Sequence, residues 1–538
     1  MRVALAQINS TLGNFSGNQN KILNFIQRAV ERRCELVVFP EAALFGYHPF
    51  DLLERGEVVE QQMKALAQIE KKIPAGVTAV IGVITKNPSK KGRPYFNSVA
   101  VVERKKKTRF FHKQLLPTGD VFDEARFVEP GHTKDNTLKI RDKKVQITIC
   151  EDIWAWPEQD GSSPYPVNPL TAIKAKVDLV INVSASPYFP GRIKRRKELA
   201  ALTARHFRAP MIYVNMVGAQ DEIIFDGASF AIDKHGKSLL ECIKFGEDLN
   251  VLDLNTLEGG TRPQKLSVTE EIHQALVLGI RDFCDKTGLK KVHLGLSGGI
   301  DSAVVAALAV DALGPSRVTT VAMPGPFSSE VSLTLAEKLA KNLGVRLLQM
   351  PISQAYTEIK TEIEASLGTR EFSVLHENLQ ARLRGLFLMS LANAENSLLL
   401  STSNKSEFAT GYSTLYGDMC GGLAVIGDLT KKQTYELAKL YNQTAELIPE
   451  EIISRAPSAE LRPNQKDQDT LPSYDLLDKS VEKIVENCGR AGTVTDKWLL
   501  PILMRTEFKR WQAAPILKVS RHSFGRGRRY PIAHQAKL

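Results

Sequence analysis

Residues 292–302 read Val-His-Leu-Gly-Leu-Ser-Gly-Gly-Ile-Asp-Ser, and this stretch decides the fold of the second half of the chain. Its apolar start predicts a short strand, and the alanine-rich segment Ala303–Leu313 predicts a helix that ends at Gly314. A strand, a glycine turn and a helix N-terminus gather unpaired N–H groups and the positive end of the helix dipole around an anion. Gly298 and Gly299 allow a phosphate to approach the backbone closely, and Asp301 can hold Mg²⁺. No Lys follows the glycines, so this is not the common Walker A loop. The alternative to a phosphate-binding loop is an ordinary glycine turn before a helix.

Length and composition point to a soluble, multidomain protein. The chain has 538 residues, 43% of them hydrophobic and 24% charged, so we expect two to four domains. No apolar run approaches the roughly 20 residues that span a bilayer, and the first residues predict a strand rather than a signal peptide. The six cysteines form no Cys-x-x-Cys pair, which argues against a disulfide framework and a structural zinc site. We therefore expect a cytoplasmic protein with no membrane partner.

The net charge of +11 raises the possibility of nucleic-acid binding, but the charge is concentrated in two places. Residues 509–538 carry eight Lys or Arg and no acidic residue, and a second cluster at 104–109 falls in a predicted hairpin. Basic runs of this kind are more often solvated faces or subunit contacts. The sequence therefore favours a protein without a nucleic-acid partner.

Alternating strand and helix patterns predict an α/β architecture in both halves. In the first half, polar clusters follow strands ending at Phe39, Ile149 and Val183, which is where α/β proteins place active sites. We predict a first domain over 1–255, a linker over 256–268 around Gly259-Gly260 and Pro263, and a second domain over 269–538. Repeated strand–helix–strand units after residue 269 predict a doubly wound parallel sheet, followed by a mostly helical region from about residue 365.

The first half also contains a candidate nucleophile with its two partners. Cys150 ends an apolar strand, Glu41 ends another, and Lys113 lies between them in the sequence. A thiol attacks as the thiolate, so it needs a base for its proton and a cation for the developing charge. A carboxylate and an ammonium supply these roles, although a cysteine at a strand end is more often part of the core.

These motifs resemble two known families. Residues 295–302 resemble the pyrophosphate loop of the ATP pyrophosphatases, and Glu41, Lys113 and Cys150 resemble the Glu–Lys–Cys triad of the nitrilase superfamily. A nitrilase-like half before an ATP-pyrophosphatase half is similar to the glutamine-dependent NAD synthetases. Further matching segments lie at residues 121–124, 184–188, 218–222, 377–382, 404–407, 416–418, 456–463 and 524–529. The resemblance implies a nitrilase-like α-β-β-α sandwich followed by a doubly wound parallel-sheet domain.

The resemblance also implies a reaction. ATP adenylates the nicotinate carboxylate of deamido-NAD with release of diphosphate, and ammonia from glutamine then gives NAD and AMP. Cys150 would attack the glutamine amide, with Glu41 as base and Lys113 stabilising the oxyanion, and with Glu124 as an auxiliary carboxylate. It further implies Mg²⁺ as cofactor, a shielded path for ammonia and a homo-oligomer paired through the synthetase domains.

The resemblance assigns the remaining contacts by position. Glutamine would contact Gly119, Ser186 and Arg192, and deamido-NAD would contact Asn378, Glu407 and Lys509. Magnesium would bind Asp301 and Glu407. ATP would contact Gly295, Leu296, Ser297, Gly298, Gly299, Ile300, Asp301, Ser302, Thr402 and Lys431. For Lys431 and Lys509, the residues alone fit exposed surface lysines equally well.

Two positions depart from the family pattern. The family has Tyr six residues after the lysine, where this chain has Gly119, and Gly before Asn-Lys-Ser-Glu, where this chain has Ser403. We expect the first to weaken glutamine recognition and the second to alter a loop of the nucleotide site.

Two other functions remain open at this point. One is an ATP-pyrophosphatase amidotransferase that acts on a different carboxylate or nucleobase. The other is a nucleotide-binding regulatory or scaffold protein without activity, which is disfavoured because Glu41, Lys113, Cys150 and Asp301 are all present.

Overall fold

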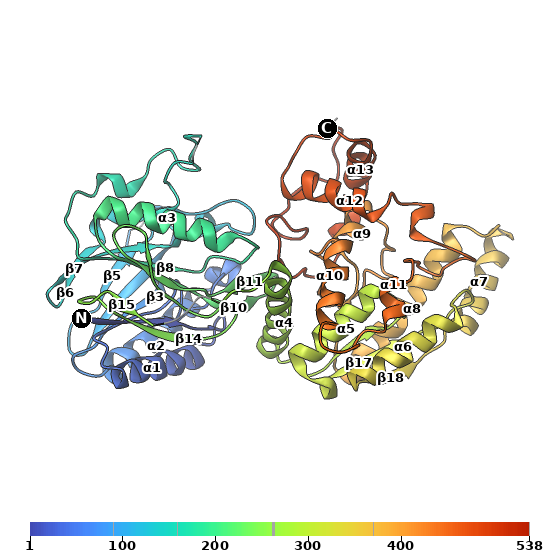
Figure 1. Cartoon of the computed structure of the whole chain (residues 1–538), viewed down its shortest axis with the longest axis horizontal. Helices are drawn as coiled ribbons and strands as arrows, with labels where there is room; N and C mark the ends of the chain where they lie inside the picture. Colours follow the sequence, from blue (N-terminus) through green and yellow to red (C-terminus); the bar gives the residue numbers. More distant parts are fainter. Residues whose placement is uncertain (90, 159, 261–263, 370, 537–538) are drawn as a thin grey trace. The chain divides into compact units, whose positions relative to one another are not determined.

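The computed structural model describes residues 1–89, 91–158, 160–260, 264–369 and 371–536. The chain divides into two compact units, Met1–Lys265 and Leu266–Leu538. Each unit has its own sheets and helices (Figure 1). Within the described residues, no helix is long and apolar enough to cross a membrane.

The first unit contains two large β-sheets. The seven-stranded sheet has the order β15-β14-β1-β2-β3-β4-β5, with bounds Glu258–Gly259, Asp248–Asp253, Arg2–Gln7, Leu36–Val38, Thr78–Lys86, Tyr95–Glu103 and Arg109–His112. The six-stranded sheet has the order β13-β12-β9-β8-β7-β6, with bounds Ser238–Glu241, Phe230–Ile232, Met211–Asn215, Leu179–Ser184, Lys143–Ile149 and Thr137–Ile140. Strands β10 (Val217–Gln220) and β11 (Ile223–Asp226) form a separate hairpin. The predicted hairpin around the basic cluster is confirmed, because β4 and β5 are antiparallel neighbours.

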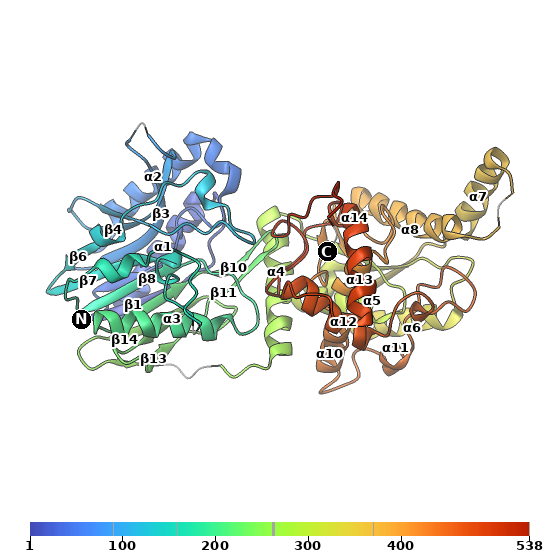
Figure 2. The same ribbon diagram turned by 90° about the horizontal axis from the view of Figure 1, so that it is seen from above.

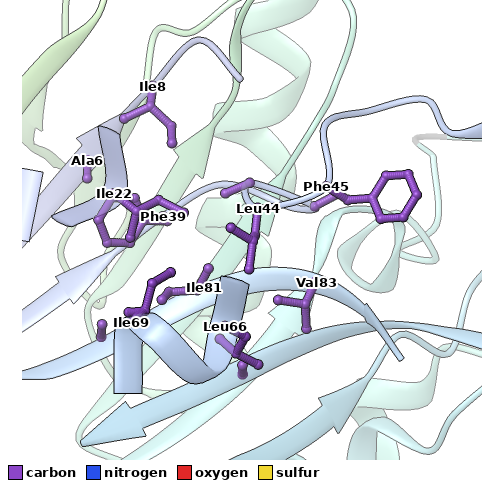
Figure 3. Packing of buried hydrophobic residues seen from close by; sticks show 14 of the residues in the cluster. Ala6, Ile8, Ile22, Phe39, Leu44, Phe45, Leu66, Ile69, Ile81 and Val83 are labelled. Carbon is purple, nitrogen blue, oxygen red and sulfur yellow. The ribbon is translucent and has the colours of Figure 1, made fainter. Parts of the chain in front are cut away.

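Side-chain alternation along the strands explains why the unit has layers. On β1, Val3 and Leu5 join the core that also contains Ile147 and Ile181 of the other sheet, so this core lies between the two sheets. The alternate residues of β1 face α1 (Phe15–Glu31) and α2 (Gly56–Lys72), as Figure 3 shows for a core that includes Ala6, Ile22, Leu66, Ile69, Ile81 and Val83. Helix α3 (Arg192–Phe207) packs on the six-stranded sheet through Leu199, Ala204 and Phe207. The predicted α-β-β-α sandwich is confirmed.

The second unit contains a five-stranded, all-parallel sheet in the order β18-β17-β16-β19-β20, which confirms the predicted doubly wound parallel sheet. The strand bounds are Arg346–Gln349, Val318–Ala322, Val292–Gly295, Leu398–Ser401 and Leu423–Ala424. Helix α8 (Val374–Glu395) covers one face, where Leu388 packs with Val321 and Leu399. The sheet is also packed by α5 (Ile300–Leu313) and α6 (Glu330–Leu343), and α5 is covered in turn by α4 (Val268–Thr287) and α10 (Lys431–Tyr441) (Figure 2).

The predicted mostly helical region from about residue 365 is confirmed only in part, because strands β19 and β20 of the sheet also lie there. Helices α7 (Ser353–Leu367) and α11 (Glu450–Ser454) lie outside the sheet, and a separate apolar core joins α9, α12 and α13, with α14 following. Their bounds are Lys405–Thr410, Tyr474–Val481, Val494–Arg505 and Glu507–Arg510. Arg510 and Lys518 of the basic C-terminal region are buried and donate to carbonyl groups of this unit, so they are not part of a solvated face.

The predicted linker over 256–268 is partly wrong. Glu258–Gly259 forms β15, which pairs with β14 and extends the seven-stranded sheet. Helix α4 begins at Val268, after a capping box formed by Ser267 and Glu270. Residues 261–263 of the predicted linker, including Pro263, lie outside the described residues, as do residues 537–538 at the end of the predicted second domain.

Two candidate active sites

Cys150 lies at the sharp turn that ends β7. It begins a short 3₁₀ helix, Cys150–Ile153, and its φ of 43° is in the left-handed region. The buried carboxylate of Asp152 accepts N–H bonds from Ile149 at 2.9 Å, Gln114 at 2.9 Å and Leu115 at 3.0 Å. Hydrogen bonds to Asp152 therefore link the turn at Cys150 to the segment that follows Lys113.

Glu41 and Lys113 are buried together in this site. Lys113 Nζ lies 2.8 Å from Glu41 Oε1 and 2.8 Å from Glu124 Oε1. Asn97 Nδ2 donates to Glu41 Oε1 at 2.7 Å, and the N–H of Ala185 donates to Glu41 Oε2 at 2.8 Å. Each oxygen of Glu41 thus has a donor, which fixes the direction in which this carboxylate faces.

Burial controls the protonation of this site. Burial raises the pKa of the Cys150 thiol well above its ordinary value, with Glu41 adding to the shift and Lys113 opposing it. Burial also raises the pKa of Glu41, again against Lys113. For Lys113, burial lowers the pKa, but Glu124 and Glu41 outweigh it and the net shift is upward. The resting site therefore holds a neutral thiol beside a charged ammonium, and attack by sulfur requires a base.

The predicted glutamine contacts lie in different environments. Ser186 is buried, and its hydroxyl accepts a bond from Arg196 Nε at 3.1 Å. The guanidinium of Arg192 lies 3.8 Å from the ring centre of Trp154, and burial lowers its pKa to about 10. Gly119 is exposed, its φ is outside the left-handed region, and an added Cβ would meet no atom within 4 Å. Gly119 is therefore not a glycine that the backbone requires.

The loop predicted to bind phosphate in the second unit has the expected strand–turn–helix form. Strand β16 leads through Ser297 and Gly298 into α5, whose N-cap is Gly299 and whose C-cap is Gly314. Gly298 has φ of +77°, and a Cβ there would lie 2.3 Å from the backbone oxygen of Ser332. No other residue type fits at Gly298 without movement of α6.

One cavity of about 320 Å³ gathers the predicted nucleotide residues. Its lining also contains Glu407 and Ser403, the latter buried without a left-handed φ. A volume of this size is in the range of small-molecule sites. The predicted ATP contacts in the lining are Gly295, Leu296, Ser297, Gly298, Gly299, Ile300, Asp301, Ser302, Thr402 and Lys431.

Lys431 is not a surface lysine, because only 2% of it is exposed. Its Nζ lies 2.5 Å from Asp301 Oδ2 and 3.4 Å from Glu407 Oε1, and Asn404 Nδ2 donates to Asp301 Oδ1 at 3.0 Å. Burial and the nearby Asp301 raise the pKa of Glu407 to about 8, despite Lys431. The raised pKa means that Glu407 is mostly protonated at neutral pH while it faces Asp301 alone, and a cation between the two groups would favour its ionised form. Carboxylate oxygens are the ligands that Mg²⁺ prefers. Asp301 and Glu407 therefore fit a magnesium ion, although the described residues contain no cluster of three metal-ligating side chains.

Asn378 and Lys509 are not among the residues that line this cavity. Asn378 Oδ1 accepts a bond from the hydroxyl of Thr414 at 2.7 Å, and Thr414 does line the cavity. Lys509 Nζ donates to the carbonyls of Gly411 and Ser413 at 2.8 and 2.7 Å. Both side chains therefore hold the segment 411–414 rather than lie in the cavity wall.

Sequence reasoning gave no role to several charged residues in the same cavity. Arg384 lines it, donates through Nε to the carbonyl of Met323 at 3.1 Å, and has a pKa lowered by burial to about 10. Glu460 also lines it and accepts from Ser332 Oγ at 2.7 Å and Arg455 Nη2 at 2.8 Å. The only sequence signal was position: Arg384 lies two residues after the matched segment 377–382, and Glu460 lies inside the matched segment 456–463.

Comparisons with known proteins agree with the division of the chain into two units. The carbon-nitrogen hydrolase family matches residues 2–261, and the NAD synthase family matches residues 272–512. Fold, sites and family matches together define the class: a carbon-nitrogen hydrolase domain joined to an NAD synthase domain.

Full-length relatives make the assignment narrower. The chain is 42% identical to the glutamine-dependent NAD(+) synthetase of Synechocystis sp., covering 99% of this chain and 98% of the relative. It is 37% identical to the glutamine-dependent NAD(+) synthetase of Thermotoga maritima, covering 100% of this chain and 99% of the relative. The solved glutamine-dependent NAD+ synthetase of Acinetobacter baumannii, in complex with ADP, is 34% identical with a TM-score of 0.77, covering 99% of this chain and 98% of that chain. This chain belongs to the glutamine-dependent NAD(+) synthetase family.

Proposed function

We propose that this protein makes NAD from deamido-NAD, using ATP to activate the carboxylate and glutamine to supply ammonia. One observation supports the proposal: the residues proposed to react in both units are present in a chain that is 42% identical to a full-length glutamine-dependent NAD(+) synthetase. Glu41 and Lys113 are paired at 2.8 Å in the unit that carries Cys150, and Asp301 lines the nucleotide cavity of the other unit.

In the first unit, Cys150 attacks the side-chain amide of glutamine. Glu41 takes the thiol proton as the C–S bond forms, which the high pKa of the resting thiol makes necessary. Lys113 stays protonated between Glu41 and Glu124 and stabilises the negative oxygen of the tetrahedral intermediate. Glu41 returns the proton to the departing ammonia, and water then hydrolyses the γ-glutamyl thioester to release glutamate. Ser186 and Arg192 would hold the glutamine, with the guanidinium facing its α-carboxylate.

In the second unit, the nicotinate carboxylate attacks the α-phosphorus of ATP and diphosphate leaves. The N–H groups at the start of α5 and the ammonium of Lys431, which line this cavity, would hold the phosphates. Asp301 and Glu407 would hold Mg²⁺, which would supply positive charge beside the departing diphosphate. Ammonia then attacks the acyl-adenylate to give NAD and AMP. The relative solved with ADP supports an adenine nucleotide as the occupant of this cavity.

A panel of acceptors tests the substrate. With ATP, Mg²⁺ and glutamine, we expect NAD from deamido-NAD and no amidated product from xanthylate or aspartate. Amidation of xanthylate or aspartate without NAD formation would assign the chain to another ATP-pyrophosphatase amidotransferase. The resemblance also supports a cytoplasmic homo-oligomer paired through the synthetase units. Light scattering of the intact chain would test whether it is an oligomer.

Gly119→Tyr is expected to lower the KM for glutamine severalfold. A tyrosine there gives glutamine a ring to pack on and a hydroxyl to bond, worth about 1–2 kcal/mol together. A Cβ at Gly119 meets nothing within 4 Å, so the first side-chain atom creates no clash. Steady-state glutamate release would measure the change, and ammonia-dependent NAD formation should stay the same.

Gly119→Ala is the matched control and should leave the glutamine KM unchanged, because it adds a methyl group that faces open space. Slower glutamate release together with a lower melting temperature in Gly119→Tyr would contradict the expectation. It would show that the larger side chain disturbs the segment of Lys113 instead of completing the pocket.

Gly298→Ala is expected to raise the KM for ATP at least tenfold with either nitrogen donor. The methyl group would lie 2.3 Å from the backbone oxygen of Ser332, so the loop or α6 must move and the phosphate-binding N–H groups move with it. The left-handed φ adds backbone strain of about 1–3 kcal/mol. Initial rates at varied ATP, with ammonium as donor, would measure the effect.

Gly314→Ala at the other end of α5 is its control. Gly314 has φ of +80°, but a Cβ there meets nothing within 4 Å, so this variant carries the strain without the clash. We expect a lower melting temperature and an unchanged ATP KM. Equal ATP KM values for the two variants would contradict the proposed phosphate loop.

A further inference from the structure

The segment 185–187 after β8 connects two functions of the first unit. Its Ala185 N–H holds Glu41 Oε2 at 2.8 Å, and Ser186 is the proposed glutamine contact. A shift of this segment would therefore disturb glutamine binding and one of the bonds to the base. What holds the segment in place decides how well the site is formed.

Arg196 of α3 binds three polar groups of that segment. Its Nε donates to Ser186 Oγ at 3.1 Å, and its Nη2 donates to the carbonyls of Ser186 at 2.7 Å and Pro187 at 2.9 Å. Asn215 Oδ1 accepts the N–H of Ser186 at 2.9 Å. The hydroxyl of Ser186 is thus oriented by a guanidinium and not by solvent.

Arg196 is also one of the most unusual charges in the molecule, because none of its side chain is exposed. Its Nη1 pairs with Asp226 Oδ1 at 2.7 Å, and only 3% of the Asp226 side chain is exposed. A buried ion pair adds little net stability compared with apolar residues of similar size. The role of this arginine is geometric. Its planar guanidinium donates to four acceptors at once, which the ammonium of a lysine cannot do in this arrangement.

We propose that Arg196, held by Asp226, is a positioning residue that sets the affinity of this site for glutamine through Ser186. This inference rests on the proposed glutaminase function of the first unit. Arg196 does not touch the reacting groups in this account. Glu41 keeps its bonds to Asn97 and Lys113 when the segment shifts, so the base stays in place.

The test is Arg196→Lys, which keeps a positive charge opposite Asp226 and removes the guanidinium that donates to Ser186 and Pro187. Measured by glutamate release, we expect the KM for glutamine to rise at least tenfold while kcat falls less than threefold. Loss of a contact that binds substrate and transition state equally has this signature. Ammonia-dependent NAD formation should match the wild type, since the second unit is not altered.

Arg195→Lys is the matched control. Arg195 is the neighbouring residue on α3 and forms surface ion pairs with Glu158 and Glu198, so its replacement should leave the glutamine KM unchanged. Asp226→Asn provides a second variant that keeps the shape of the partner and removes its charge. It should raise the glutamine KM in the same direction as Arg196→Lys, by a smaller factor.

Two results would overturn the inference. One is a glutamine KM within twofold of wild type in both Arg196→Lys and Asp226→Asn. The other is a parallel fall of kcat, ammonia-dependent rate and melting temperature, which would assign Arg196 a purely structural role. If the wild-type protein releases glutamate from glutamine but forms no NAD, the proposed function is refuted and this inference stands. If the wild-type protein releases no glutamate, both are refuted.

Discussion

Replacing Asp301 with Ala is expected to abolish NAD formation with glutamine and with ammonium alike. Asp301 lines the nucleotide cavity and pairs with Lys431 at 2.5 Å, so its loss removes a proposed magnesium ligand and frees the lysine. Removal of one preorganised electrostatic contact costs on the order of 3–4 kcal/mol of transition-state stabilisation, or about 10²–10³-fold in rate. Initial rates of AMP release, with each nitrogen donor in turn, would measure the loss.

Asp311→Ala on the same helix is the control for this variant. Asp311 pairs with His273 at 2.9 Å near the far end of α5, and 42% of its side chain is exposed. We expect this variant to retain activity with both donors. Normal ammonia-dependent turnover in Asp301→Ala would show that Asp301 holds neither the metal nor the phosphates.

Replacing Cys150 with Ala is expected to abolish glutamine-dependent synthesis while ammonia-dependent synthesis continues. The change removes the proposed nucleophile of amide hydrolysis and leaves the nucleotide cavity of the other unit intact. Glutamate release should fall to the background rate, and NAD formation from ammonium should match the wild type.

Cys242→Ala is the matched control, because Cys242 is also buried and belongs to the same core between the sheets as Cys150. It should lower the melting temperature slightly and leave glutamine use unchanged. Comparable glutamine-driven rates in Cys150→Ala and wild type would refute the assignment of the triad.

Neighbouring residues in the sequence were sufficient to predict the strands, turns and helix ends that depend on local backbone geometry. The strand, glycine turn and helix around Gly298 follow from apolar alternation and from residues that cap a helix, and all three are present. The parallel sheet follows in turn from repeated strand–helix–strand units. The sandwich of the first unit rested on the resemblance, because short strands in that half do not reveal which sheet they join.

The remaining features depend on contacts between distant parts of the chain. Asp152 binds Gln114 and Leu115, which lie 38 and 37 residues away, and Arg196 pairs with Asp226 across 30 residues. Burial of Lys431 depends on Asp301, 130 residues earlier, so the sequence could not separate it from a surface lysine. Strand β15 was assigned to the linker because its two residues, Glu258 and Gly259, show no strand pattern and pair only through β14.

The most direct test of the whole account follows one nitrogen atom. Purified protein is incubated with deamido-NAD, ATP, Mg²⁺ and glutamine labelled with ¹⁵N in its side-chain amide, and products are identified by mass spectrometry. The account predicts NAD that carries the ¹⁵N label, formed in equal amounts with AMP and glutamate. Formation of ADP in place of AMP, or unlabelled NAD, would contradict it.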